Sequence, residues 1–235
     1  MNAIILTTQT IHHTYYVKSL LKIKKVNFTV VIENKKKKPP FKIDHYLDRY
    51  MSNFEKKKWF KNKDKEIKDY CKPIFTNDIN KDLILLRKLK NLKPNFILIF
   101  GTGILSKKFL NNFNNIYNFH GGDLENYRGL DSHFWSMYHG EFKKLYIYLH
   151  EAKPRVDTGR YLYKKLINIK KNTNISSIRY LNTQLCIMIT RKFISDFKKK
   201  KILKKKLNSI GRYYSYMPKD LKQIVIKKFN KFKKF

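Results

Sequence analysis

One run of the chain, Phe96–Phe100, is apolar at every position and is followed directly by Gly101. A strand with one face in water alternates apolar and polar residues, so a continuous apolar run predicts a strand that is buried on both faces. Other runs rich in apolar, β-branched and aromatic residues predict strands at residues 3–7, 26–32, 116–119 and 145–149. The sequence therefore favours a sheet with a buried centre.

Segments with a helical spacing of apolar residues separate these strands. They cover residues 11–24, 43–60, 83–92, 106–113 and 132–139. Strands that alternate with helices predict an α/β fold, here a Rossmann-like twisted and mostly parallel sheet with helices on both faces. Ligands of such sheets bind beyond the carboxyl ends of the central strands. Gly101 and residues 118–122 fall at such ends, so we expect the site there.

The last third of the sequence is rich in lysine and poor in strand patterns. We expect a basic helix over residues 191–207 and a further helix at the C-terminus. The domain prediction is a catalytic domain over residues 1–170 and a short helical, lysine-rich extension over 171–235 that packs on or next to the core. A tyrosine-rich run at 213–218 either packs back over the core or joins a subunit contact, so a homodimer is left open.

The formal net charge of +36 first suggests nucleic-acid binding, because basic side chains release counterions from phosphate backbones. Only 8 of the 53 basic residues are arginine, however, and base and phosphate recognition favours the arginine fork. We therefore do not expect a nucleic-acid partner. Most lysines are interpreted as solvated surface, with attraction to a nucleotide, an acidic glycan or a membrane surface as the alternative.

Cys71 and Cys186 lack the spacing of a metal site, so neither a disulfide framework nor a bound metal is expected. The first ten residues lack the basic region of a signal peptide. No apolar run approaches the roughly 20 residues that a transmembrane helix needs. A cytoplasmic protein without a transmembrane segment is the resulting expectation.

The residue types that could carry chemistry gather around Asn118 and His120. At the end of a strand, side chains two residues apart point to the same side, so this amide and imidazole can converge on one substrate oxygen. Both can donate to a developing oxyanion, and the carboxylate of Asp157 could hold the imidazole in one tautomer. Gly121 and Gly122 leave room for a substrate. The trio suits transfer of an acyl group to an amine.

Residues 118–129 read NFHGGDLENYRG, and residues 157–159 read DTG. This pattern resembles the folate-dependent formyltransferases, whose members carry N-x-H-P-S-L-L-P-x-Y-R-G and then D-T-G at a similar spacing. Residues 103–109 are similar to the family segment whose backbone clamps the pterin of 10-formyltetrahydrofolate. The resemblance covers residues 95–163 well and the N-terminal third only as a pattern.

The resemblance implies a role for each matching residue. Asn118 and His120 would stabilise the oxyanion that forms when an acceptor amine attacks the formyl carbon, and Asp157 would hold His120. The folate would contact Gly101, Gly103, Ile104, Leu105, Val156 and Asp157. The acceptor would contact Gly121, Gly122, Tyr127 and Arg128, although a structural turn is an equal alternative for the last two. His150 either supports the site or is a core histidine, and His12 with His13 either approaches a nucleotide or caps a helix.

The chain departs from the family pattern at residues 121–123, which replace P-S-L, at Glu125, which replaces a proline, and at 153–155 before D-T-G. The part after the motifs is too short for the C-terminal barrel of methionyl-tRNA formyltransferases, and residues 7–10 lack the glycines of a ribonucleotide-binding loop. The pattern therefore looks most like the branch that formylates nucleotide-linked amino sugars for surface polysaccharides. Another amine acceptor, such as an aminoacyl-tRNA, and a non-catalytic relative stay open.

Overall fold

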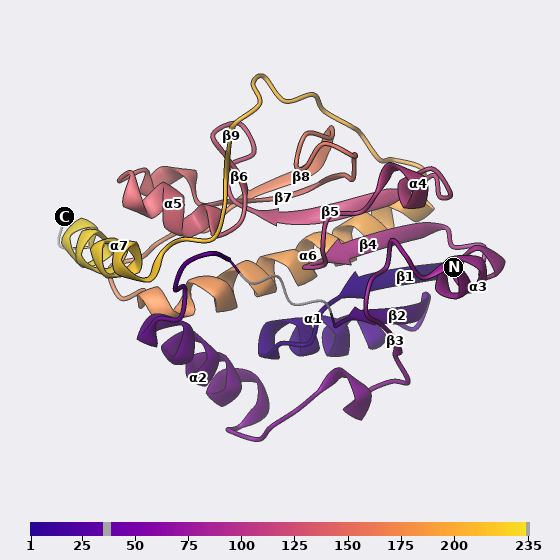
Figure 1. Cartoon of the computed structure of the whole chain (residues 1–235), viewed down its shortest axis with the longest axis horizontal. Coiled ribbons are helices and arrows are strands. Elements are labelled where there is room, and N and C mark those ends of the chain that lie inside the picture. The colour runs from indigo at the N-terminus through magenta and orange to yellow at the C-terminus, as the bar shows by residue number, and fades with distance from the viewer. Residues whose placement is uncertain (35–38, 234–235) are drawn as a thin grey trace.

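The computed structural model describes residues 1–34 and 39–233, which form a central sheet with helices on both faces (Figure 1). Seven strands of this part pair in the order β3-β2-β1-β4-β5-β7-β8. Their bounds are β1 Asn2–Thr7, β2 Asn27–Glu33, β3 Ile74–Thr76, β4 Phe96–Phe100, β5 Ile116–Gly121, β7 Tyr146–Glu151 and β8 Tyr161–Leu166. The five strands β3, β2, β1, β4 and β5 are parallel, whereas β7 runs antiparallel to β5 and β8 antiparallel to β7. The predicted α/β fold is confirmed.

The centre of the sheet follows the apolar pattern of the sequence. β4 is buried at all five positions and lies between β1 and β5. Its neighbour β1 is buried at five of its six positions, and Ile5 of β1 pairs with Leu98 of β4. Because both faces of these strands are covered, no polar position is needed along β4. The continuous run that defined the sequence prediction thus forms the core of the molecule.

Two helical layers cover the sheet. On one face, α1 (Ile11–Leu21) and α6 (Ile178–Lys198) share a core with the inward side chains of β1, β4 and β5. On the other face, α3 (Leu83–Asn91) and α4 (Lys107–Leu110) pack on the alternate side chains of the same strands. The remaining helices are α2 Tyr46–Phe60, α5 Ser132–Tyr138 and α7 Lys219–Phe232, with short 3₁₀ turns at Ile67–Asp69, Phe142–Lys144 and Ile175–Ser177.

The C-terminal third differs from the sequence prediction in its helix bounds. The helix predicted over residues 191–207 is α6, which begins at Ile178 and ends at Lys198. Its buried side chains recur at helical spacing as far as Phe193 and Ile194, and no apolar stripe continues through the lysine run beyond them. Lys200 then adopts a left-handed conformation, with φ of 55°. The prediction was wrong here because lysine favours helices locally but supplies no buried face.

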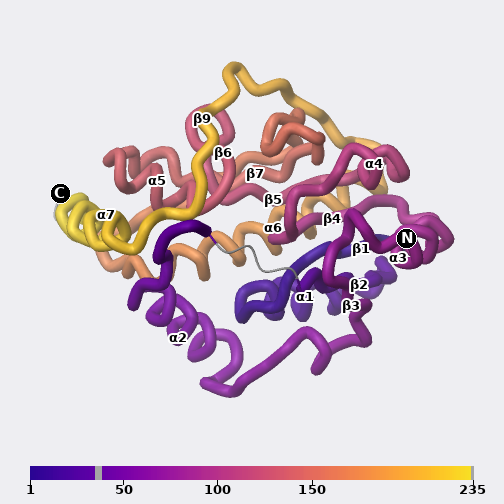
Figure 2. The backbone as a smooth tube through the Cα atoms, viewed as in Figure 1, coloured from indigo at the N-terminus to yellow at the C-terminus, as the bar shows by residue number. Residues whose placement is uncertain are grey.

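After α6 the chain returns across the molecule to the site end of the sheet (Figure 2). It pairs with β8 at the Lys205–Tyr161 bridge and then forms β9, Arg212–Tyr214, parallel to β6, Tyr127–Gly129. The sequence pattern predicted neither of these short strands. Residues from both sides of position 170 belong to one core cluster, and the division of the chain at that position stays a prediction.

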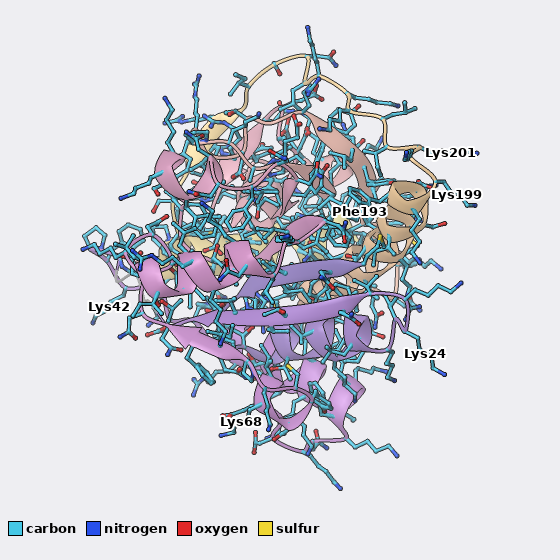
Figure 3. All side chains as sticks on the ribbon, turned by 90° about the vertical axis from the view of Figure 1, so that its right-hand side faces the viewer. Lys24, Lys42, Lys68, Phe193, Lys199 and Lys201 are labelled. Carbon is cyan, nitrogen blue, oxygen red and sulfur yellow. The ribbon has the colours of Figure 1, made fainter. Side chains whose placement is uncertain are left out.

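The labelled lysines of Figure 3 (Lys24, Lys42, Lys68, Lys199 and Lys201) extend away from the body of the protein, whereas Phe193 lies inside it. No helix among the described residues has the length and apolarity to cross a membrane.

Candidate active site

A cavity of about 800 Å³ lies at the carboxyl ends of β1, β4 and β5. Its walls include Thr8 after β1, Gly101 after β4, and the last residues of β5 from Asn118 to Gly121. This is the edge of the sheet at which parallel α/β proteins bind their ligands. The sequence prediction of the site's position therefore agrees with the cavity.

Asn118, His120 and Asp157 meet on one side of this cavity. Asn118 and His120 are two residues apart on β5, so their side chains share a face of the strand. The Asn118 Nδ2 donates to Asp157 Oδ1 at 3.2 Å, and His120 Nδ1 lies 3.3 Å from Asp157 Oδ2. The carboxylate thus bridges the amide and the imidazole, although it is 39 residues from Asn118 in the chain.

The position of Asp157 is set by hydrogen bonds from β6 to the loop that contains Asp157. Asp157 has φ of 54°, and Gly129 N–H donates to its Oδ2 at 2.9 Å. The Arg128 guanidinium donates through Nη1 to the carbonyl of Val156 at 2.7 Å. These contacts connect the Y-R-G segment of β6 directly to the D-T-G loop. The two motifs that stand apart in the sequence are one structural unit.

His150 completes the polar group. It pairs with Asn118 across β5 and β7, and its Nδ1 lies 2.9 Å from the Glu151 carbonyl, which can only accept. The neutral ring therefore carries its hydrogen on Nδ1, and Nε2 can accept from Asn118 Nδ2 at 3.2 Å. Of the two sequence alternatives for His150, support of the site fits this contact.

Burial and the neighbouring charge shift the pKa of Asp157, and likewise that of His120, in opposite directions. Burial tends to raise the pKa of Asp157, but His120, His150 and the Gly129 N–H outweigh it and hold that pKa below its usual range. Burial lowers the pKa of His120, and the nearby Asp157 opposes this only in part. At neutral pH the carboxylate is therefore charged and the imidazole is neutral.

The tautomer of His120 follows from its second contact. Nε2 lies 2.8 Å from the Tyr127 carbonyl, so the hydrogen of the neutral ring is on Nε2 and donates to that oxygen. Nδ1 then has a free electron pair beside Asp157 Oδ2. His120 can accept a proton at Nδ1, where the carboxylate would stabilise the resulting cation. Donation from this ring to an oxyanion would require a change from this arrangement.

The residues predicted to contact folate line one wall of the cavity. Gly101, Gly103, Ile104, Leu105 and Val156 are all among the lining residues, together with apolar side chains of Ile99, Leu110 and Ala152. Gly101 has φ of +81°, and a Cβ there would lie 2.5 Å from the ring of His13, which explains the glycine. A flat aromatic ring system could be bound against such a wall.

Two polar side chains that the sequence analysis missed hold this wall in place. Glu33, which is 3% exposed, accepts the Gly103 N–H through Oε2 at 2.6 Å and the Ile79 N–H through Oε1 at 3.1 Å. Asn80 donates to the Ile104 carbonyl at 2.9 Å and accepts the Ser106 N–H at 2.7 Å. In the sequence, the one indication of this role was the position of Glu33 at the end of the apolar run of β2.

The predicted acceptor residues separate into two groups. Gly121 lines the cavity, but Gly122, Tyr127 and Arg128 do not. Gly122 packs against Ser132 and His120, so no side chain fits there. Tyr127 donates its hydroxyl to Glu141, and Arg128 donates through Nε to the Gly211 carbonyl at 2.6 Å. The structural-turn alternative fits Tyr127 and Arg128 in this structure.

The other part of the cavity lining, which we call the acceptor wall after the ligand proposed for it, comes from segments far apart in the sequence. His12 of α1 and Met51 of α2 line it, as do residues at the starts of α5 and α6 and in the C-terminal segment. The residues from α5, α6 and the C-terminal segment are Ser132, His133, Phe134, Ile178, Arg179, Asn182, Tyr213 and Tyr216. The Met217 N–H donates to Asp131 at 2.8 Å and Trp135 Nε1 to the Ser215 carbonyl at 2.9 Å, which fixes the C-terminal segment on this wall.

Within residues 1–34 and 39–233 there is no group of three or more His, Cys, Asp or Glu side chains arranged to hold a metal ion.

The comparisons with known proteins agree with this architecture. The family model described as formyl transferase matches residues 1–183. No curated protein matches at the sequence level. Among solved structures, a sugar N-formyltransferase from a Shewanella species is 13% identical with a TM-score of 0.65, over 97% of this chain and 87% of that one.

Two further similar structures are a formyltransferase in complex with its ligands and a methionyl-tRNA formyltransferase. The formyltransferase PseJ from Anoxybacillus kamchatkensis, in complex with UDP-4,6-dideoxy-4-formamido-L-AltNAc and tetrahydrofolate, is 15% identical with a TM-score of 0.58, over 95% of this chain and 89% of that one. Methionyl-tRNA formyltransferase from Clostridium thermocellum is 18% identical with a TM-score of 0.57, over 92% and 73%. At these identities the similarity demonstrates a shared fold.

Proposed function

The chain belongs to the formyl transferase family, and from that premise we propose that it transfers a formyl group from 10-formyltetrahydrofolate to the amine of a nucleotide-linked amino sugar. The observation that carries the proposal is the Asp157 carboxylate between Asn118 and His120, at the edge of a cavity with two distinct walls. Folate when bound would supply the formyl carbon. The Anoxybacillus neighbour, which was crystallised with a folate and a nucleotide-linked sugar, supports both ligand classes.

The residues of the site divide the chemistry as follows. The acceptor nitrogen forms a bond to the formyl carbon, and Asn118 turns one amide hydrogen from Asp157 or His150 to the oxygen on which charge develops. His120 Nδ1 takes the proton that the amine loses, and Asp157 stabilises the cation. The bond between the formyl carbon and the folate nitrogen then breaks, and His120 returns the proton to that nitrogen. The products are a formamide and tetrahydrofolate.

The cavity walls suit the two substrates. The Ile99, Leu105 and Val156 side chains offer an apolar slot for a pterin. The acceptor wall includes polar and aromatic side chains, among them Arg179, Tyr213 and Tyr216, and could hold a nucleotide and its sugar. A C-terminal segment that packs on this wall belongs to the site itself.

The test is direct. Purified protein is mixed with 10-formyltetrahydrofolate and UDP- and dTDP-linked sugars that carry an amine at position 3 or 4, with His120→Ala as the control. Tetrahydrofolate and a product heavier by one formyl group are measured. Turnover that the variant lacks would support the proposal.

Other outcomes separate its parts. If no sugar reacts but folate raises the melting temperature, the amino-sugar acceptor is wrong and folate use stands. If folate gives no protection either, the catalytic proposal fails.

A further inference from the structure

A second cavity lies at the opposite edge of the sheet from the candidate active site. Its volume is about 560 Å³, which is within the range of small-molecule sites, and we call it the basic pocket. It lies where β1 and β5 begin and α6 ends, and Figure 1 shows the N-terminus and the end of α6 on the same side of the molecule. Its lining residues are Met1, Asn115, Tyr117, Phe197, Lys198, Lys200, Ile202 and Lys204.

The basic pocket differs in charge from the active-site cavity. Three of its eight described lining residues are lysines, and none of the eight is acidic. The lining of the active-site cavity has one lysine, Lys153, and four acidic residues, which are Glu33, Asp48, Asp131 and Asp157. The lysines of this chain are therefore unevenly distributed between its two cavities. The excess of positive charge in the basic pocket favours an anionic ligand.

Two of the three lysines are available to such a ligand. The Lys204 ammonium lies 2.9 Å from Glu151 Oε1 and is already paired. Asp196, the acidic residue nearest to the other two in the sequence, pairs at 3.0 Å with a lysine one turn earlier on α6. Within the part of the chain that the structure describes, Lys198 and Lys200 form no ion pair. Both ammonium groups can therefore bind a phosphate as charged donors.

Backbone hydrogen bonds hold the lysine segment at both ends. The Lys200 N–H donates to the Phe197 carbonyl at 3.1 Å, and the Lys201 N–H donates to the Asp196 carbonyl at 2.8 Å, which are the two bonds of a Schellman motif. The bridge between Lys205 and β8 anchors the segment on its other side. The basic pocket is thus preorganised, which lowers the entropic cost of binding.

The remaining surface of the basic pocket is largely apolar. The Phe197 ring packs edge-on against Phe96, with 5.2 Å between the centroids, and lies 5.4 Å from Phe193, so its position is fixed by the core. Ile202 lines the pocket beside it. An aromatic ring or an alkyl chain of a ligand can pack against this surface.

We propose that the basic pocket binds an organic phosphate, whose phosphate is held by Lys198 and Lys200 and whose apolar or aromatic part lies against Phe197. A soluble nucleotide and a lipid phosphate share this chemistry. The ligand would bind at the edge of the sheet away from the reacting groups, so the inference does not depend on formyl transfer.

The first test uses protein with ¹³C-labelled methionine methyl groups. Met1 lines the basic pocket and Met51 lines the active-site cavity, so their resonances report the two places separately. ATP and dihexanoyl phosphatidic acid are titrated at 150 mM salt, with inorganic triphosphate as the anion that lacks an apolar part. At least one organic phosphate should shift Met1 and bind on the order of tenfold more tightly than triphosphate. The tighter of the two identifies the source of the ligand.

Three results would overturn the proposal. They are an unchanged Met1 resonance with both organic phosphates, an equal affinity for triphosphate, and a shift of Met51 alone. The last result would place the ligand in the active-site cavity and would leave the proposed function standing.

The sequence supplies a matched pair of double variants. Lys198→Gln with Lys200→Gln removes two charges from the basic pocket, and we expect the dissociation constant to rise at least tenfold. Lys199→Gln with Lys201→Gln removes the same charge from neighbouring positions outside it, where both side chains extend away from the protein (Figure 3). We expect less than a twofold change there. Equal losses in the two double variants would show diffuse attraction and no specific site.

Lys200→Gly separates binding from folding. Lys200 has φ of 55°, a left-handed conformation that favours glycine, so this variant should keep or raise the melting temperature. Lys93→Gly is its control, because Lys93 has φ of 45° and lies outside the lining of the basic pocket. We expect severalfold weaker binding in Lys200→Gly alone. Wild-type affinity in Lys200→Gly would show that Lys200 does not hold the phosphate and would overturn the assignment.

Discussion

The two walls of the cavity are built in opposite ways. The folate wall comes mainly from two short stretches, residues 99–105 and 150–157, with Glu33 and Asn80 bonded to its backbone. The acceptor wall draws on α1, α2, α5, α6 and the segment around β9. A wall made by neighbours in sequence can be recognised from a motif, whereas one assembled from five distant segments depends on the whole fold. We therefore expect folate binding to depend on residues close together in the sequence, and the choice of acceptor to depend on the packing of the whole fold.

The largest effect should come from the Asp157 carboxylate, which contacts both Asn118 and His120. Asp157→Asn keeps the shape of the side chain but removes the charge that would stabilise protonated His120. We expect kcat to fall on the order of 10³-fold, since the charge and the proton transfer are lost together. Single-turnover formation of tetrahydrofolate measures this.

Folate protection should persist in Asp157→Asn, because the apolar wall and its anchors are untouched. A fall in kcat of less than tenfold would show that Asp157 acts only as a turn residue.

A smaller effect should be confined to the folate wall. In Glu33→Gln, the new NH₂ group must face either the Gly103 N–H or the Ile79 N–H, so one anchoring bond is lost. We expect folate affinity to fall about tenfold or more, measured by titration with thermal readout. The reactivity of saturated enzyme should change little.

Glu66→Gln removes the same charge at an exposed position and is the matched control. An unchanged folate affinity in Glu33→Gln would mean that the loop keeps its shape without this anchor.

Two buried histidines, His133 in the acceptor wall and His13 against Gly101, should give the protein a pH dependence of stability. Burial lowers the pKa of both His13 and His133 to about 4, against about 6.5 in an unfolded chain. Between these values the unfolded state binds more protons, so stability is complete above about pH 6.5 and falls as the pH drops towards 4. Each histidine contributes a slope of about 1.4 kcal/mol per pH unit inside this window.

His133→Asn, whose amide can still donate to the Tyr146 carbonyl, should reduce that slope. Urea unfolding at pH 4.5, 5.5 and 6.5 measures it. An equal slope in the variant would mean that the pKa of His133 is the same in the folded and the unfolded protein.

The same contrast explains what the sequence could predict. The run Phe96–Phe100 specified the central strand, because a doubly buried strand needs an unbroken apolar pattern. Asn118, His120 and Asp157 were predicted as a group because motif spacing is visible in the sequence, and their side chains are in contact in the structure. Asn182 and the tyrosines of the C-terminal segment carried no such signal. Their place in the cavity depends on how α6 and β9 pack, which is a tertiary property.

The strands that the sequence analysis missed follow the same physics. β9, Arg212–Tyr214, has only three residues and is largely exposed, so it has no burial pattern to detect. Its partner is β6, and the pair forms because Gly211 and Leu130 make backbone bonds around it. The helix predicted over residues 191–207 had the wrong bounds, because burial along α6 determines where it begins and ends.

The smallest effect should come from the lysines, although they dominate the composition. Lys199 and Lys201 extend into solvent after the end of α6, and neither lines the cavity (Figure 3). Lys199→Gln with Lys201→Gln lowers the net charge while leaving both walls intact, so we expect stability to change by no more than about 0.5 kcal/mol. The acceptor KM should also stay constant at 150 mM salt, where the Debye length is about 8 Å. A KM that rises severalfold and depends steeply on salt would instead show that long-range attraction by the lysine surface contributes to acceptor binding, in addition to the two walls of the cavity.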